Sequence, residues 1–208
     1  MIAAALSLSV RVAIVATILV TIAGTLTGRV LARRAFRGRE VVETLLTLPL
    51  VLPPTVTGYA LLVVLGRSGL GLPIPFTWLA CVVAAAVMSF PLMHRAARVA
   101  FEELDPRHTL TAASLGASRL RSFFSIELPL ARRGLAAGIA LAFARGLGEF
   151  GATLLLAGNI PGRTQTLPLA VYEASLTGEN RAALVLCLLL TGVSIAVLLL
   201  VARLGRSR

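Results

Sequence analysis

The sequence contains no lysine, and charged residues of any kind are scarce. Only 14% of the 208 residues are charged and 57% are hydrophobic, whereas an ordinary soluble domain is about 25% charged. A water-soluble core of this length could not bury so much apolar surface, which excludes a soluble enzyme and indicates a membrane protein. All 20 basic residues are arginine and 9 residues are acidic, so the net charge is +11. The arginines lie between long uncharged runs, which favours the positive-inside bias of a membrane protein over binding of nucleic acid.

Cysteine and histidine are nearly absent as well. Cys81 and Cys187 lie in apolar runs, and His94 and His108 sit beside arginines without companion ligands. A metal site or a disulfide framework needs more of these residues at closer spacing, so we expect no metal site, no bound cofactor and no catalytic residue. A glycine-rich phosphate loop ending in Lys-Ser or Lys-Thr is missing too, because the chain has no lysine.

Five apolar runs are long enough to cross a bilayer, which takes about 20 residues of helix. None of them alternates polar and apolar residues as a membrane strand would, so we predict an all-α, polytopic transmembrane helical bundle with five spans. The runs cover about residues 7–31, 44–66, 76–93, 134–158 and 182–202. A sixth, short helix at Leu167–Leu176 stays open. The arginines that follow the first run favour a retained span over a cleaved signal peptide.

The distribution of arginine predicts the orientation of the spans. If the segment after the first run is cytoplasmic, the inner segments hold 15 of the 20 arginines and the outer segments hold 4. The remaining one, Arg145, lies inside the fourth run. This bias places the amino terminus outside and the carboxyl terminus in the cytoplasm.

Prolines interrupt the second run at Pro49, Pro53 and Pro54. Each proline removes a backbone donor and breaks the regular hydrogen bonding of a helix. The freed carbonyl groups need partners in lipid, so this segment is expected to face protein or a water-filled path.

Residues 94–133 form the one long polar segment. Asp105 and Pro106 indicate a helix start, with Asp as the cap and Pro at the first helical position. Apolar residues then recur at spacings of three and four, which predicts a single apolar stripe on a surface helix. The stripe consists of Leu110, Ala113, Ala117, Leu120 and Phe124. It either packs on the inner ends of the chain's own spans or docks into a groove on a cytoplasmic partner.

The same segment resembles the EAA loop of ABC importer permeases. The resemblance rests on three groups of residues at the family's spacing: Leu110-Thr111-Ala112, Gly116, and Ile126-Glu127-Leu128-Pro129. Leu110 replaces the Glu that opens the family's motif, so no ionic contact is expected there. The resemblance implies that residues at about 100–130 couple the chain to an ATPase, through the apolar stripe together with Gly116 and Pro129.

Four other segments resemble the molybdate permeases of that family, and sulfate permeases share a looser version of them. The segments cover residues 48–59, 88–93, 143–153 and 158–164. The resemblance implies a type I ABC importer permease fold, with residues 1–208 as a single transmembrane domain that imports molybdate or tungstate. A permease for sulfate or another oxyanion is the alternative.

The resemblance also implies partners and a location. Two copies of the permease would form the pore in the plasma (inner) membrane. Two cytoplasmic ABC ATPase subunits would hydrolyse ATP, and an external molybdate-binding protein would deliver the anion. The chain itself would then be a pore subunit and not an enzyme. A passive channel is the physical alternative, and ATP dependence of uptake distinguishes the two.

An oxyanion is costly to place in hydrocarbon, so a permease should lower that cost with hydroxyl groups, backbone amides and helix ends. Candidates near the proline and glycine breaks are Pro54, Thr55, Thr57, Ser89 and Thr153. The alternative for each hydroxyl is a bond to its own or a neighbouring helix. Arg145 and Glu149, four residues apart inside the fourth run, share a helix face. They form either a structural pair or a part of the gate.

Overall fold

Helices are the only regular elements among residues 2–206, which the computed structural model describes, with side chains described to Leu199. This confirms the all-α prediction. In chain order the elements are α1 (Ile2–Arg33), α2 (Arg39–Val51), α3 (Pro54–Leu65), α4 (Trp78–Glu102), α5 (Pro106–Ser114), α6 (Arg119–Ser122), the π-helix η1 (Phe123–Glu127), α7 (Leu128–Leu147), α8 (Gly151–Ala157), α9 (Leu167–Leu176) and α10 (Asn180–Arg206).

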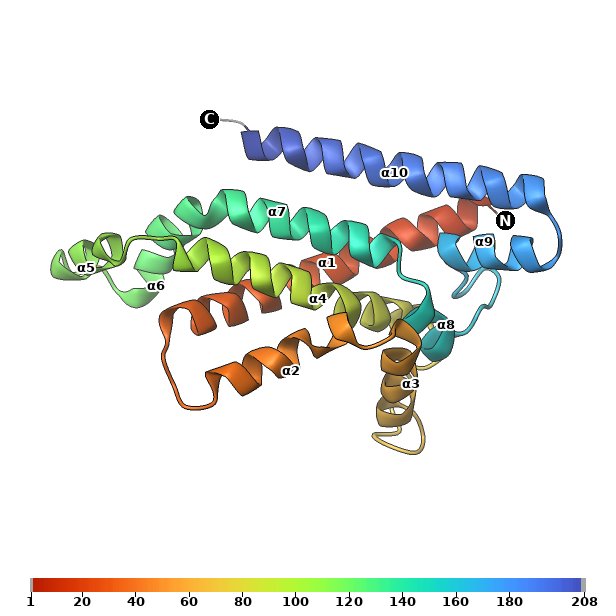
Figure 1. The fold of residues 1–208 in the computed structure, drawn as a ribbon, viewed down its shortest axis with the longest axis horizontal. Helices are drawn as coiled ribbons and strands as arrows, with labels where there is room; N and C mark the ends of the chain where they lie inside the picture. Colours follow the sequence, from red (N-terminus) through yellow and green to blue (C-terminus); the bar gives the residue numbers. More distant parts are fainter. Residues whose placement is uncertain (1, 207–208) are drawn as a thin grey trace.

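Three long helices, α1, α4 and α7, lie side by side along the longest axis of the molecule (Figure 1). Glycines on α1 and α7 face α4 at distances that leave no room for a side chain. A Cβ at Gly28 would lie 2.8 Å from Ala97 Cβ, and a Cβ at Gly134 would lie 2.6 Å from Ala100 Cβ. Lipid supplies no hydrophobic force between helices, so close approach through small residues is what holds such a bundle together.

Two of the predicted spans are bent pairs of helices. The axes of α2 and α3 differ by 113° across Leu52 and Pro53, and those of α7 and α8 differ by 58°. Counting each bent pair as one span, the described helices give up to five spans, of which α1, α4 and α10 are single helices long enough to cross a bilayer. The prolines of the second run therefore do more than interrupt hydrogen bonds: α3 turns away from the long axis (Figure 1).

The helix left open at Leu167–Leu176 is present as α9. Its 10 residues extend about 15 Å, which is too short to cross a bilayer. It packs against α10 and the first turns of α1, where the backbone N–H of Leu167 donates to Ser9 Oγ at 2.7 Å.

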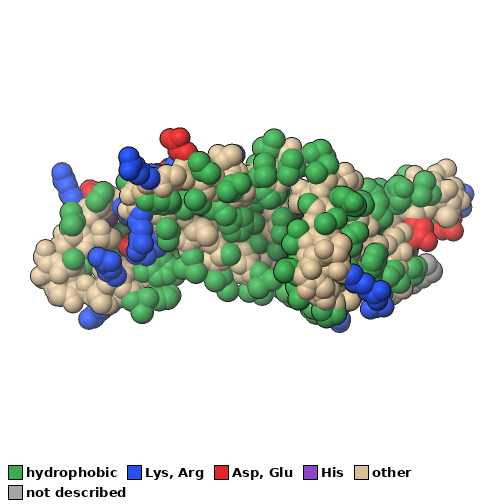
Figure 2. Space-filling view, turned by 90° about the horizontal axis from the view of Figure 1, so that it is seen from below, with side chains coloured by type: hydrophobic (Ala, Val, Ile, Leu, Met, Phe, Trp, Pro, Cys, Tyr) green, Lys and Arg blue, Asp and Glu red, His purple; other side chains and the backbone are tan. Residues whose placement is uncertain are grey.

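The molecule is elongated, and its two ends differ. The α5 and α6 helices lie at one end, whereas α9 and the first turns of α1 and α10 lie at the other (Figure 1). Apolar side chains cover much of the middle, and charged side chains gather toward the ends (Figure 2). The helix α10 runs back toward the α5–α6 end, away from the end at which α1 begins (Figure 1). The arginines counted at the carboxyl terminus (Arg203, Arg206 and Arg208) lie outside the residues whose side chains are described.

Candidate functional site

The predicted surface helix is two helices joined by a turn at Gly116, so the expectation of one continuous helix is wrong. Asp105 caps α5 as predicted, because its Oδ1 accepts from the backbone N–H of Arg107 at 2.9 Å. Gly116 ends α5 with a φ of 82°. Its own N–H donates to the carbonyl of Ala113, and the N–H of Ala117 reaches back to the carbonyl of Ala112 at 2.9 Å. This bond pattern is a Schellman motif, and its left-handed residue favours glycine.

Four large apolar side chains of the segment from α5 to η1 face solvent. Their exposed fractions run from 57% for Phe124 to 83% for Leu115, with Leu110 and Leu120 between them. Ala113 and Pro129 are exposed, and Ala117 is half-buried. We call the surface formed by Leu110, Leu115, Leu120 and Phe124 the α5–α6 surface. It does not pack on the inner ends of the chain's own spans, so it is available to a partner.

Leu115 belongs to this surface although the stripe pattern omitted it. The stripe pattern omitted Leu115 because a new helix begins after it. Ser118 caps this helix, α6, since its Oγ accepts from the backbone N–H of Arg121 at 3.3 Å. The phase of the apolar repeat is reset between the two helices. The Gly116 and Ser118 pair, a helix stop followed two residues later by a helix start, is the signal that could have revealed this.

The α5–α6 surface joins the long helix α7 through the π-helix η1. Pro129 is the second residue of α7. A proline inside a helical run clashes with the carbonyl four residues earlier, which here lies in η1. A wider turn relieves that clash, and the N–H of Leu128 donates to the carbonyl of Phe123, five residues back. The widened turn at the start of the long helix thereby has a local cause in Pro129.

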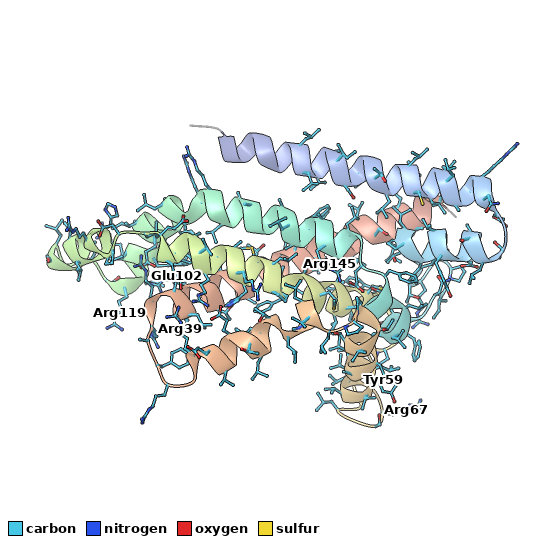
Figure 3. All side chains as sticks on the ribbon, viewed as in Figure 1. Arg39, Tyr59, Arg67, Glu102, Arg119 and Arg145 are labelled. Atoms are coloured by element: carbon cyan, nitrogen blue, oxygen red, sulfur yellow. The ribbon has the colours of Figure 1, made fainter. Side chains whose placement is uncertain are left out.

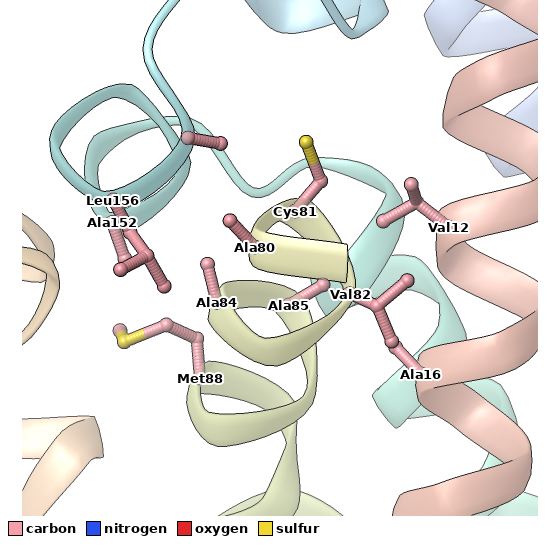
Figure 4. Packing of buried hydrophobic residues seen from close by; sticks show 11 residues of the cluster. Val12, Ala16, Ala80, Cys81, Val82, Ala84, Ala85, Met88, Ala152 and Leu156 are labelled. Carbon is pink, nitrogen blue, oxygen red and sulfur yellow. The ribbon is translucent and has the colours of Figure 1, made fainter. Parts of the chain in front are cut away.

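A second candidate site lies where the two bent pairs meet. A Cβ at Gly58 of α3 would lie 2.7 Å from Ala152 Cα of α8, and a Cβ at Gly151 would lie 3.0 Å from Pro54 Cβ. An alanine-rich cluster holds α8 against α4, with Ala84 and Met88 of α4 and Ala152 and Leu156 of α8 (Figure 4). The breaks in the second and fourth runs are thus packed on each other.

The predicted pore residues discussed next lie on α3, α4 and α8. Thr57 on α3 is buried, and its Oγ1 has no hydrogen-bond partner among the described residues. Thr153 on α8 is buried, whereas Pro54 and Thr55 are exposed. Ser89 on α4 is buried and donates to the carbonyl of Ala85 at 2.7 Å, so its hydroxyl is used by its own helix. Thr57 is therefore the hydroxyl most in need of a partner.

Arg145 and Glu149 form the predicted ion pair within one protomer. Arg145 Nη1 lies 2.6 Å from Glu149 Oε2, and the two side chains are 26% and 2% exposed. The other carboxylate oxygen accepts from the backbone N–H of Ala152 at 2.8 Å, at the first turn of α8. Figure 3 places Arg145 well away from both ends of the molecule. The pair joins the last turn of α7 to the first turn of α8 across the 58° bend.

Bent spans packed on each other in a long helical bundle define a polytopic membrane protein. Solved structures with this fold include an inward-facing form of the MetNI methionine ABC transporter, which matches with a TM-score of 0.80 at 16% identity over 98% of this chain and 95% of that chain. An amino acid ABC transporter crystallised with histidines matches with a TM-score of 0.70 at 16% identity, over 99% and 92% of the two chains.

The chain belongs to the family of binding-protein-dependent transport system inner membrane components, whose model matches residues 21–208. It is 49% identical over 185 residues to a putative molybdenum transport system permease protein, YvgM, of Bacillus subtilis, covering 85% of this chain and 82% of the relative. It is 46% identical over 192 residues to the molybdenum transport system permease protein ModB of Escherichia coli, covering 86% and 83%. The expected type I importer permease fold is confirmed.

Proposed function

We propose that this chain is the membrane-spanning permease subunit of an ATP-driven importer that carries molybdate into the cytoplasm. The observation that carries the proposal is 46–49% identity to molybdenum permeases over more than four fifths of the chain. Tungstate has the same tetrahedral shape and charge and is expected to share the path. Sulfate is the competing cargo.

The assembly in this proposal has two permease chains, two cytoplasmic ATPase subunits and an external binding protein. The α5–α6 surface suits the ATPase, because four large apolar side chains stay exposed at one end of the bundle. A helix laid into a hydrophobic groove is a recurring mode of recognition between proteins. ATP is bound and hydrolysed by the ATPase subunits.

The proposed path for the anion runs past the meeting point of the two bent pairs. Thr57 offers a buried hydroxyl without a partner, and the α3 and α8 helices begin beside it. The Arg145–Glu149 pair cancels most of its own charge and holds α8 at its angle. The main role of the pair is therefore structural, and it would affect gating only by fixing the position of α8.

The proposal orients the chain in a plasma (inner) membrane with its amino terminus outside and its carboxyl terminus in the cytoplasm. The arginine bias supports this direction. The positions of the helices also agree with it, since α1 begins at the end opposite the α5–α6 surface.

The test is reconstitution of the purified permease with its ATPase and binding protein in liposomes, followed by uptake of molybdate. We expect uptake that requires ATP and the binding protein, and that unlabelled tungstate inhibits more strongly than sulfate. Uptake that proceeds without ATP would show a passive channel. Stronger inhibition by sulfate than by tungstate would show a sulfate permease.

A further inference from the structure

An ion pair between two distant segments ties the base of the α5–α6 surface to α1. Arg29 Nε lies 2.7 Å from Glu127 Oε2, and Arg29 Nη2 lies 2.9 Å from Glu127 Oε1. Two parallel N–H···O bonds to one carboxylate are the strongest and most directional form of this contact. The Glu127 side chain is 5% exposed and that of Arg29 is 30% exposed. The pair is therefore protected on one side from competition by water.

An aromatic contact reinforces the ion pair. The guanidinium of Arg29 also lies over the ring of Phe123, 4.8 Å from its centroid. Phe123 in turn contacts the exposed Phe124 edge-on, with centroids 4.9 Å apart, and the buried Phe101 of α4 at 6.3 Å. Phe124 belongs to the α5–α6 surface. A continuous series of contacts thus runs from that surface to α1.

The position of the pair in the π-helix gives it a mechanical consequence. Glu127 is the last residue of η1, whose hydrogen bonds are those of a widened turn. Such turns are rare, interrupt the regular hydrogen bonding of an α-helix for a single turn and are frequent at functional sites. Along the chain, the α5–α6 surface is joined to α7 only through this irregular turn. Arg29 contacts both ends of this turn, the ring of Phe123 and the carboxylate of Glu127, and so connects η1 directly to a different long helix.

The helix α1 can carry a displacement to the opposite end of the molecule. It is 32 residues long and packs closely along α4 through Gly24 and Gly28. Near its start, Ser9 binds the first residue of α9. One end of α1 therefore contacts η1 at the base of the α5–α6 surface, and the other end contacts α9.

From this geometry we propose that Arg29 and Glu127 are positioning residues that make α1 move together with the α5–α6 surface when the ATPase changes state. The inference rests on the proposed function, because it assumes that an ATPase docks on that surface. Without the pair, ATP hydrolysis would continue, but less of each cycle would reach the transport path.

The main test is a double variant, Arg29→Met with Glu127→Leu, in the complete transporter. Replacing both partners by apolar residues leaves no buried charge alone, and such replacements are often neutral for stability. We expect a variant that inserts and binds the ATPase like the wild type. The ratio of ATP hydrolysed to molybdate transported should rise roughly threefold to tenfold, a size of effect that mutations between two coupled sites can produce.

The matched control is Arg39→Gln, which removes a second ion pair at the same end of the molecule. Arg39 Nη2 lies 2.8 Å from Glu102 Oε1, and both side chains are partly exposed (Figure 3). An exposed pair contributes little, so this variant should keep the wild-type ratio. An equal rise in both variants would show a general effect of charge and would overturn the proposal.

A second measurement does not depend on the cargo. Hydrogen exchange of the backbone amides at residues 27–33 is followed in the permease–ATPase complex, with and without ATP. Wild-type protein should show an ATP-dependent change in exchange at these residues, and the double variant should lose it. If the wild type does not take up molybdate but still shows the ATP-dependent change in hydrogen exchange, only the proposed cargo is refuted. An unchanged ATP response in the double variant would refute the coupling role.

The conservative variant Arg29→Lys keeps the proposal testable if the double variant does not insert. Lysine keeps the charge but cannot make two parallel bonds to one carboxylate. We expect a coupling ratio between those of the wild type and the double variant. A wild-type ratio together with a wild-type exchange response in Arg29→Lys would show that the two-bond geometry has no role.

Discussion

Glu149 has two separate tasks at the residue scale. One carboxylate oxygen faces Arg145, and the other accepts the backbone N–H of Ala152. The first contact neutralises a charge in the middle of the bundle, and the second satisfies one of the free donors at the start of α8. A carboxylate is suited to both tasks because its two oxygens accept independently.

Glu149→Gln separates these tasks, because glutamine keeps a carbonyl oxygen for Ala152 but has no charge for Arg145. We expect a loss in the free energy of unfolding that is smaller than the loss of about 3–5 kcal/mol for a fully buried pair, because the Arg145 side chain left alone is 26% exposed. The double variant Arg145→Met with Glu149→Gln should be milder than Glu149→Gln. Thermal unfolding in detergent measures both. Additive losses in this double-mutant cycle would rule out the pairing as an energetic unit.

At the scale of the elements, the contact between α3 and α8 depends on the absence of a side chain at Gly58. A Cβ there would lie 2.7 Å from Ala152 Cα and 2.8 Å from its carbonyl oxygen. Both are backbone atoms, so no side chain can rotate away. Any substitution must move one helix of one bent pair relative to the other.

Gly58→Ala is therefore expected to destabilise the protein by about 1–3 kcal/mol, as overpacking does elsewhere. Gly192 provides the control, because it lies in α10 and a Cβ there would meet no atom of the described residues within 4 Å. Gly192→Ala should leave stability unchanged or raise it by up to about 1 kcal/mol, since alanine favours a helix. The measurement is the thermal midpoint of each variant. Equal midpoints for the two variants would contradict the close packing of α3 on α8.

Gly116 joins the two helices of the α5–α6 surface, and its φ of 82° is strained for any other residue. Gly116→Arg should cost about 1–2 kcal/mol in the turn, place a charge in an apolar surface and weaken binding of the ATPase. Gly178, in the turn between α9 and α10, has a φ of 76° and equally open surroundings. Gly178→Arg should carry the same strain and keep the ATPase. Co-purification of the ATPase with each inserted variant distinguishes them, and wild-type stoichiometry with Gly116→Arg would show that this turn takes no part in docking.

The sequence was sufficient to predict where the spans break but not how far they bend. Pro53 and Pro54 remove backbone donors, so a break there follows from local chemistry. The 113° angle depends on the contact of Gly58 with Ala152, two residues 94 positions apart, which no local pattern contains. The Arg145–Glu149 pair was predictable because four residues of helix bring the two side chains together. The Arg29–Glu127 pair was not, because its partners are 98 positions apart and each is unremarkable in its own segment.

At the scale of the whole molecule, the directions of α1 and α10 determine how three parts of the protein lie relative to the membrane. The α5–α6 surface and the last described turns of α10 lie toward one end, and the turn between α9 and α10, which contains Gly178, lies at the other (Figure 1). If an ATPase binds the α5–α6 surface from the cytoplasm, Gly178 and the start of α1 must be outside. The arginine bias predicts the same orientation from independent information, since it uses charge and not shape.

This topology can be tested with single cysteines in a background in which Cys81 and Cys187 are replaced by alanine. Leu115→Cys reports on the α5–α6 surface, where the native side chain is 83% exposed, and Glu179→Cys reports on the exposed turn between α9 and α10. In intact cells a membrane-impermeant maleimide should label Glu179→Cys and should label Leu115→Cys only after the cells are opened. A reporter fused after Arg208 should read cytoplasmic, and a tag at the amino terminus should read external. Labelling of Leu115→Cys from outside would show that the orientation is the reverse of the predicted one. A cytoplasmic amino terminus combined with a cytoplasmic Arg208 would require an even number of spans, which is incompatible with α1 and α10 crossing the membrane as the structure arranges them.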